Sequence, residues 1–86
     1  HPRLINASIT GFGLRGPYRD RAGYDVNAQG MGGLMSYNGE AGGEPLRVGV
    51  AVADVYSGAL ITQAIHAALY ARERTGRGAR VDVNLL

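Results

Sequence analysis

The feature that most constrains this chain is a change of pattern at one acidic residue. Before it, Val48, Val50 and Val52 alternate with small residues, which is typical of an extended segment buried on both sides. After it, from Val55 to about Arg74, apolar residues recur with the helical period and share one face: Ile61, Ala64, Ile65, Ala68 and Leu69. The residue between the two patterns is Asp54, so we expect Asp54 at the start of a long helix.

Two interpretations of Asp54 follow from this position. Aspartate is a favoured N-cap, because its side chain accepts a hydrogen bond from a free N–H of the first helical turn. A carboxylate at a helix N-terminus is also held ionised, and an oriented anion can act as a nucleophile. The sequence allows both roles at once.

The other segments predict an α/β unit. A strand is expected over residues 3–10, a Gly-rich loop over 11–25, a short helix over 26–35 with Asp25 as its cap, a loop over 36–44, and a closing strand over 81–85. This strand–loop–helix–strand order is typical of a mostly parallel sheet. Ligands of such sheets bind beyond the carboxyl ends of the strands, where Asp54 and the 11–25 loop are both expected.

Composition narrows the classes of function. The nine basic residues are all Arg, the net charge is only +2, and aromatic residues are few, so nucleic acid is not expected as a partner. With no Cys there is neither a disulfide nor a thiol nucleophile, and the two His are too far apart in sequence to form a metal-ligand cluster. No run of apolar residues is long enough to span a membrane, so we expect a cytoplasmic protein.

The ends of the chain and its length of 86 residues indicate an internal fragment of a larger domain. The sequence opens without Met, directly before a strand pattern, and stops within another. We therefore expect residues 1–86 to be one part of one domain, with no second domain in the segment.

One motif invites a different interpretation. Gly11, Gly13 and Gly16 match G-x-G-x-x-G directly after a strand, the pattern of dinucleotide-binding loops. That motif must open a helix, and here Pro17 and a polar loop follow. A non-catalytic dinucleotide-binding or structural segment remains an alternative, in which Asp54 is only a cap.

Five phrases in register resemble the class III CoA-transferases, the family of formyl-CoA and carnitine CoA-transferases that also contains α-methylacyl-CoA racemase. The phrases cover nearly the whole chain and lie at residues 8–18, 21–25, 29–36, 48–54 and 67–78. The resemblance implies that the fragment belongs to a Rossmann-like large domain. It also implies that the full-length protein is an interlocked homodimer and that the fragment alone is inactive.

The resemblance assigns Asp54 as the nucleophile. In that family the aspartate that opens the long helix attacks an acyl-CoA thioester, and CoA passes to a carboxylic acid through covalent aspartyl intermediates. Coenzyme A is thus a substrate, and no tightly bound cofactor is implied. The oxygens that become charged need N–H donors, and the helix N-terminus is expected to supply some of them.

The segment Arg21-Ala22-Gly23-Tyr24 matches the part of the family that lies along CoA near the thioester. Gly23 would let the backbone approach the ligand, and Arg21 could bind a phosphate or a carboxylate. The racemases that resemble this chain carry His where Tyr24 stands, thirty positions before Asp54. A phenol with an ordinary pKa of about 10 is a poor base, so a transferase is favoured over a racemase.

Overall fold

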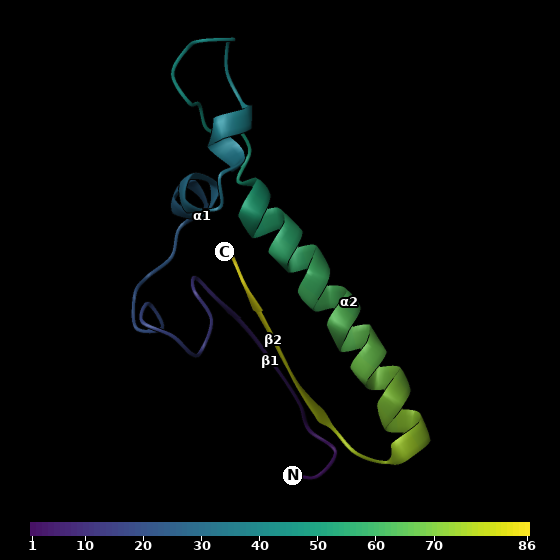
Figure 1. The fold of residues 1–86 in the computed structure, drawn as a ribbon. Helices are drawn as coiled ribbons and strands as arrows, with labels where there is room; N and C mark the ends of the chain where they lie inside the picture. The colour runs from purple at the N-terminus through teal and green to yellow at the C-terminus, as the bar shows by residue number, and fades with distance from the viewer.

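The computed structural model describes residues 1–86 as one α/β unit (Figure 1). The elements are, in order, β1 (Ile5–Thr10), α1 (Asp25–Met31), the 3₁₀ helix η1 (Leu34–Tyr37), α2 (Val52–Thr75) and β2 (Ala79–Asn84). Helix α2 carries the chain back along the sheet, so that β2 begins beside the start of β1.

The two strands pair in parallel, as the sequence predicts. The register runs from Ile5 opposite Ala79 to Thr10 opposite Asn84. Apolar and polar residues alternate along β2: Val81 and Val83 are half-buried, while Asp82 between them is exposed. Since α2 packs along this sheet, the half-buried side is the one that the helix covers (Figure 1).

The face of α2 expected to be buried is largely confirmed. Ile61 and Ala68 are buried, together with Ser57 one turn earlier, and Ala64 and Ile65 are half-buried. The remaining residue of the predicted face, Leu69, is 36% exposed, so the covered stripe of the helix is narrower than predicted.

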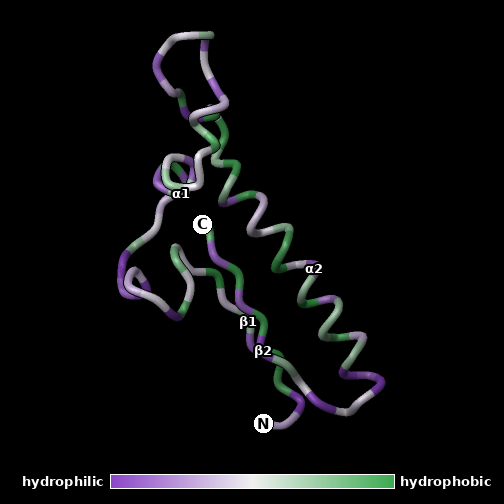
Figure 2. Tube along the Cα trace, viewed as in Figure 1, coloured by the Kyte–Doolittle hydropathy of each residue, from purple (hydrophilic) through white to green (hydrophobic).

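Helix α2 is also apolar outside this stripe. Hydrophobic residues recur along most of the helix, and hydrophilic ones gather towards its carboxyl end (Figure 2). Val55 and Tyr56 are both 64% exposed and Tyr70 is 66% exposed. A helix with apolar residues on several sides is typical of a buried helix in a larger protein.

The expected boundary at Asp54 is wrong by three residues. Helix α2 begins at Val52, its N-cap is Ala51, and no side chain of the N-cap residue bonds to the first turn. Residues 47–51 form no strand, because no other strand of this chain lies beside them. Their backbone is instead hydrogen-bonded by the side chain of Gln29.

The short helix also differs from its prediction. It covers Asp25–Met31 rather than 26–35, and its N-cap is Tyr24, so Asp25 does not cap its own helix. The C-cap of the helix is Gly32, and Gly33 follows with φ +83°, a conformation that glycine adopts readily. The chain then continues as η1.

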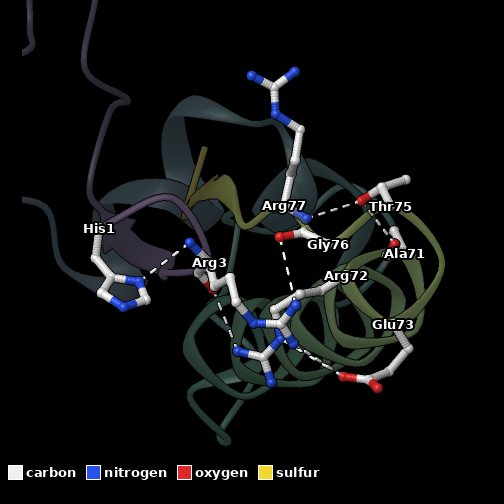
Figure 3. Close-up of polar contacts among 8 residues, drawn as sticks. All are labelled: His1, Arg3, Ala71, Arg72, Glu73, Thr75, Gly76 and Arg77. Carbon is white, nitrogen blue, oxygen red and sulfur yellow. Dashed lines mark hydrogen bonds and ion pairs between the residues drawn. The ribbon is translucent and has the colours of Figure 1, made fainter.

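The carboxyl end of α2 is closed by Gly76, which has φ +72° and donates its N–H to Arg72 O at 2.8 Å. Two arginines fasten this end to the start of the chain (Figure 3). Arg3 Nη1 donates to Gly76 O at 3.5 Å, and Arg72 Nη1 donates to Arg3 O at 3.3 Å. The exposed ion pair between Arg3 and Glu73, 3.5 Å long, adds little to stability.

The unit is elongated and buries few residues. Its accessible surface is 6390 Å², whereas a compact protein of 9.0 kDa exposes about 4,900 Å². Its radius of gyration is 16.3 Å, against about 12 Å for a compact chain of this length. Only five residues are buried, so the segment has no sizeable core of its own.

Candidate active site

The amino end of α2 lies at the carboxyl ends of both strands, together with α1 (Figure 1). An open cavity of about 220 Å³ lies at this junction. Its lining is apolar apart from one amide: Ala28, Gln29, Leu34, Val52, Ala53, Tyr56 and Leu85. Asp54 and the 11–25 loop are both expected at this edge of the sheet, and the end of that loop does lie beside Asp54, since Asp25 Oδ1 accepts a hydrogen bond from Asp54 N.

Asp54 lies in the first turn of α2 and is exposed. Its carboxylate forms no ion pair within the chain. Because the N-cap position belongs to Ala51, the interpretation of Asp54 as the helix cap is wrong. The Asp54 side chain therefore has no evident structural role in this segment.

The carboxylate that caps α2 comes from Asp25 in another element. Asp25 Oδ1 accepts a hydrogen bond from Ala53 N at 2.6 Å and another from Asp54 N at 3.1 Å. These are two of the N–H groups that an α-helix leaves free at its start. Asp25 thus supplies from α1 the cap that the sequence seemed to place at position 54.

Gln29 holds Asp25 in this position. It is 1% exposed, and its Nε2 donates to Asp25 Oδ2 at 2.6 Å. Gln29 Oε1 accepts from Val48 N at 2.8 Å, and Nε2 also lies 3.4 Å from Val50 O. One buried amide therefore ties α1 to the segment that leads into α2, and its hydrogen-bonding groups are satisfied.

Partial burial of Asp25 opposes ionisation, but the hydrogen bonds more than compensate. Those from Gln29 and from the N–H groups of Asp54 and Ala53, with the charge of Arg47, lower the pKa of Asp25 below its ordinary value. Asp25 is therefore ionised at neutral pH, and its negative charge lies at the positive end of the α2 dipole.

Tyr24 is brought close to Asp54. It directly precedes Asp25, whose carboxylate is hydrogen-bonded to the backbone of Asp54, and its own side chain is 66% exposed. Tyr24 and Asp54 thus lie on neighbouring segments at the same edge of the sheet, although they are distant in sequence.

The preceding residues of the predicted ligand segment form a loop. The Arg21 guanidinium lies over the ring of Tyr18, 4.4 Å from its centre, and Ala22 is exposed. Gly23 packs against the backbone of Gly11: a Cβ added at Gly11 would lie 2.5 Å from Gly23 Cα. The lack of a side chain at position 23 therefore has a reason within this chain, independent of any ligand.

Three of the N–H groups at the start of α2 are already hydrogen-bonded within this chain. Val52 N bonds to Val50 O at 2.7 Å, and Ala53 N and Asp54 N bond to Asp25. Val55 N begins the intrahelical ladder with Ala51 O at 3.0 Å. None of these groups is left for a reacting oxygen.

Asp25 and Gln29 are the two residues of this site that the sequence interpretation missed. Their spacing of four residues on one helix is a readable signal for a side-chain pair. Their contacts to residues 48–54 are tertiary, and the sequence carries no local signal for them. The structure contains no group of three or more His, Asp or Glu side chains arranged to hold a metal ion, and none of its helices is long and apolar enough to cross a bilayer.

Comparison with known proteins places the segment among CoA-transferases. The model of CoA-transferase family III matches residues 1–86. A succinate–glutarate CoA-transferase from Agrobacterium fabrum is 52% identical over 86 residues, which are 100% of this chain and 22% of that protein. A formyl-CoA:oxalate CoA-transferase from Streptomyces avermitilis is 51% identical over 83 residues, which are 96% of this chain and 20% of that protein.

The fold has a matching solved structure. A CAIB/BAIF family protein from Brucella suis superposes with a TM-score of 0.93 and 52% sequence identity, over 98% of this chain and 22% of that one. The chain thus spans about a fifth of the length of the relatives that it matches.

Proposed function

Because the chain belongs to CoA-transferase family III, we propose that it is the nucleophile-bearing segment of an enzyme that moves CoA from an acyl-CoA to a carboxylic acid. The observation that carries the proposal is that the Asp54 carboxylate is exposed and has no structural role in this segment. Its carboxylate is exposed at the carboxyl edge of the sheet, and the capping role that could have explained it structurally belongs to Asp25.

The proposed chemistry begins at the Asp54 carboxylate. One of its oxygens attacks the thioester carbonyl carbon, a C–O bond forms, the C–S bond breaks, and CoA leaves as thiolate. The thiolate then attacks the aspartyl carbonyl of this mixed anhydride. That step expels the donor acid as its carboxylate and leaves an aspartyl-CoA thioester.

The second half reverses these steps with another acid. The acceptor carboxylate attacks the aspartyl thioester, which gives a new anhydride and releases the thiolate. The thiolate attacks the acceptor's acyl carbon, so that the new acyl-CoA forms and the Asp54 carboxylate is regenerated. Because the N–H groups of Val52, Ala53 and Asp54 are already bonded, the oxyanions need donors other than these three.

The exposed segment Arg21–Tyr24 is proposed to lie along CoA. Tyr24 directly precedes Asp25, which is hydrogen-bonded to the backbone of Asp54, and Arg21 carries a guanidinium suited to a phosphate or a carboxylate. The proposal also includes residues 1–86 as an internal part of a Rossmann-like large domain, an interlocked homodimer, a cytoplasmic location, and CoA as a substrate with no tightly bound cofactor.

The direct test is to trap the intermediate on the full-length protein. The enzyme is incubated with acyl-CoA, quenched with hydroxylamine or borohydride, and digested for peptide mass spectrometry. We expect modification at Asp54, its absence in Asp54→Asn, and a loss of kcat of roughly 10³-fold or more in that variant. Because Asp54 is not a cap, Asp54→Asn should change the free energy of unfolding by less than about 0.5 kcal/mol.

Two results would contradict the proposal. An enzyme that turns over acyl-CoA with no modified Asp54 has no aspartyl nucleophile there. Exchange of deuterium into the α-carbon of the acyl group, without an acceptor acid, would instead identify a racemase that uses Asp54 as an acid–base group.

A further inference from the structure

The first turn of α2 is held from outside the helix. The N–H groups of its first three residues have no intrahelical partner: Val52 N bonds to Val50 O, and Ala53 N and Asp54 N bond to Asp25 Oδ1. The backbone of Asp54 itself is one of these two donors. The position of Asp54 is therefore coupled directly to α1.

The acceptor is itself fixed on its other side. Gln29 Nε2 donates to Asp25 Oδ2 at 2.6 Å, and Gln29 is nearly fully buried. The same amide accepts from Val48 N, in the segment that leads into α2. Asp25 therefore holds the first turn of α2, and Gln29 holds both Asp25 and the segment that precedes this turn.

We propose that Asp25 is a positioning residue for the reaction: its carboxylate holds the backbone of Asp54 in a fixed position relative to the loop that ends at Tyr24. This inference rests on the proposed function, since it assumes that Asp54 attacks the thioester. A nucleophile attacks efficiently only when it is held near the reacting carbon in the right orientation, and small displacements cost about 10²-fold in rate.

The arrangement has a second consequence for the nucleophile. A free helix N-terminus would stabilise the Asp54 carboxylate as an anion and occupy its lone pairs. Here Asp25 takes the N–H groups and brings its own negative charge to the same turn. The Asp54 oxygens are therefore left free to attack.

The test compares variants of the full-length protein. Asp25→Ala removes the acceptor, and we expect kcat and the single-turnover rate of Asp54 adduct formation to fall about 10²-fold with KM within about twofold. Asp82→Asn is the matched control, because this carboxylate is also hydrogen-bonded, to Ser8 and Arg80, but lies in β2. It should leave both rates unchanged.

A paired variant separates positioning from a general loss of stability. In Asp25→Asn the introduced amide still offers one oxygen to Ala53 N and Asp54 N, but its NH₂ group meets the Gln29 Nε2 donor. Adding Gln29→Glu replaces that donor by an acceptor, while the second oxygen still accepts from Val48 N; only the long hydrogen bonds of 3.5 and 3.4 Å to Val48 O and Val50 O are lost. The double variant should therefore recover part of the rate lost in Asp25→Asn.

The outcomes distinguish this inference from the function on which it rests. No Asp54 adduct in the unmodified enzyme overturns both. An adduct that forms at the same rate in the unmodified enzyme and in folded Asp25→Ala or Asp25→Asn overturns the positioning role alone. If Asp25→Ala does not fold, Asp25→Asn and its double variant decide, and a double variant no faster than Asp25→Asn overturns the proposal.

Discussion

Gly11 and Gly23 lie with their backbones in contact, and this contact joins the end of β1 to the loop proposed to bind CoA. A Cβ at Gly11 would lie 2.5 Å from Gly23 Cα and 2.6 Å from Gly23 N. These neighbours are main-chain atoms, so they cannot move aside as the end of a flexible side chain can. A side chain at either glycine would thus overlap the backbone of the other.

This pairing predicts similar effects for Gly11→Ala and Gly23→Ala. Each should lower the free energy of unfolding of the full-length protein by about 1–3 kcal/mol, measured by urea unfolding, since the added carbon overpacks the contact. Gly49→Ala is the control, because its added Cβ meets no atom of this chain. If Gly23→Ala raises KM for acyl-CoA while Gly11→Ala changes neither KM nor stability, Gly23 serves only the approach of the ligand.

At the scale of elements, α2 is fastened at both ends by groups that lie apart in sequence. Asp25 holds its first turn, and Arg3 reaches the carbonyl of Gly76 at its end (Figure 3). Gly76 lies in the left-handed region, at φ +72°, where any side chain is strained.

Gly76→Ala should therefore destabilise the full-length protein by about 1 kcal/mol, with a smaller loss for Gly76→Asn, because asparagine tolerates this conformation better. Urea unfolding measures both variants. Since Gly76 is the C-cap of α2 and Asp54 lies in the first turn, at the opposite end of this 24-residue helix, kcat should not change. Equal free energies of unfolding of the unmodified protein and both variants would show that the conformation of Gly76 does not contribute to the stability of the helix.

At the scale of the whole molecule, the surface and the shape indicate a segment that depends on neighbours. The accessible surface of 6390 Å² exceeds that of a compact protein of this mass by about a third. The exposed apolar residues of α2, among them Val55 and Tyr56, are the sites where further burial would contribute most.

The isolated chain of residues 1–86 should accordingly be unfolded or only partly helical in water. Circular dichroism should show no cooperative thermal transition, and amide exchange should be fast along both strands. A sharp transition with protected strand amides would contradict this expectation and show that the segment folds by itself.

The sequence by itself determined the local features of this protein. The 3.6-residue period of α2, the alternation in β2 and the α/β order each depend on residues near one another in the chain. It also pointed to Asp54 through a change of period, with an error of three residues in the helix start. Such local patterns can be read from the sequence because the periods of helices and strands are set by backbone geometry, which is the same wherever the segment packs.

Only the tertiary structure decided which carboxylate caps α2. The sequence offered aspartates at both 25 and 54, each next to a helix start, and nothing local shows that Asp25 bonds to residues 28 and 29 positions further on. Likewise, the 47–51 segment has the alternation of a strand, but a strand needs a partner strand. Here the side chain of Gln29 is hydrogen-bonded to the backbone of this segment instead. A hydrogen bond depends on where folding brings donor and acceptor together, which a local pattern does not record.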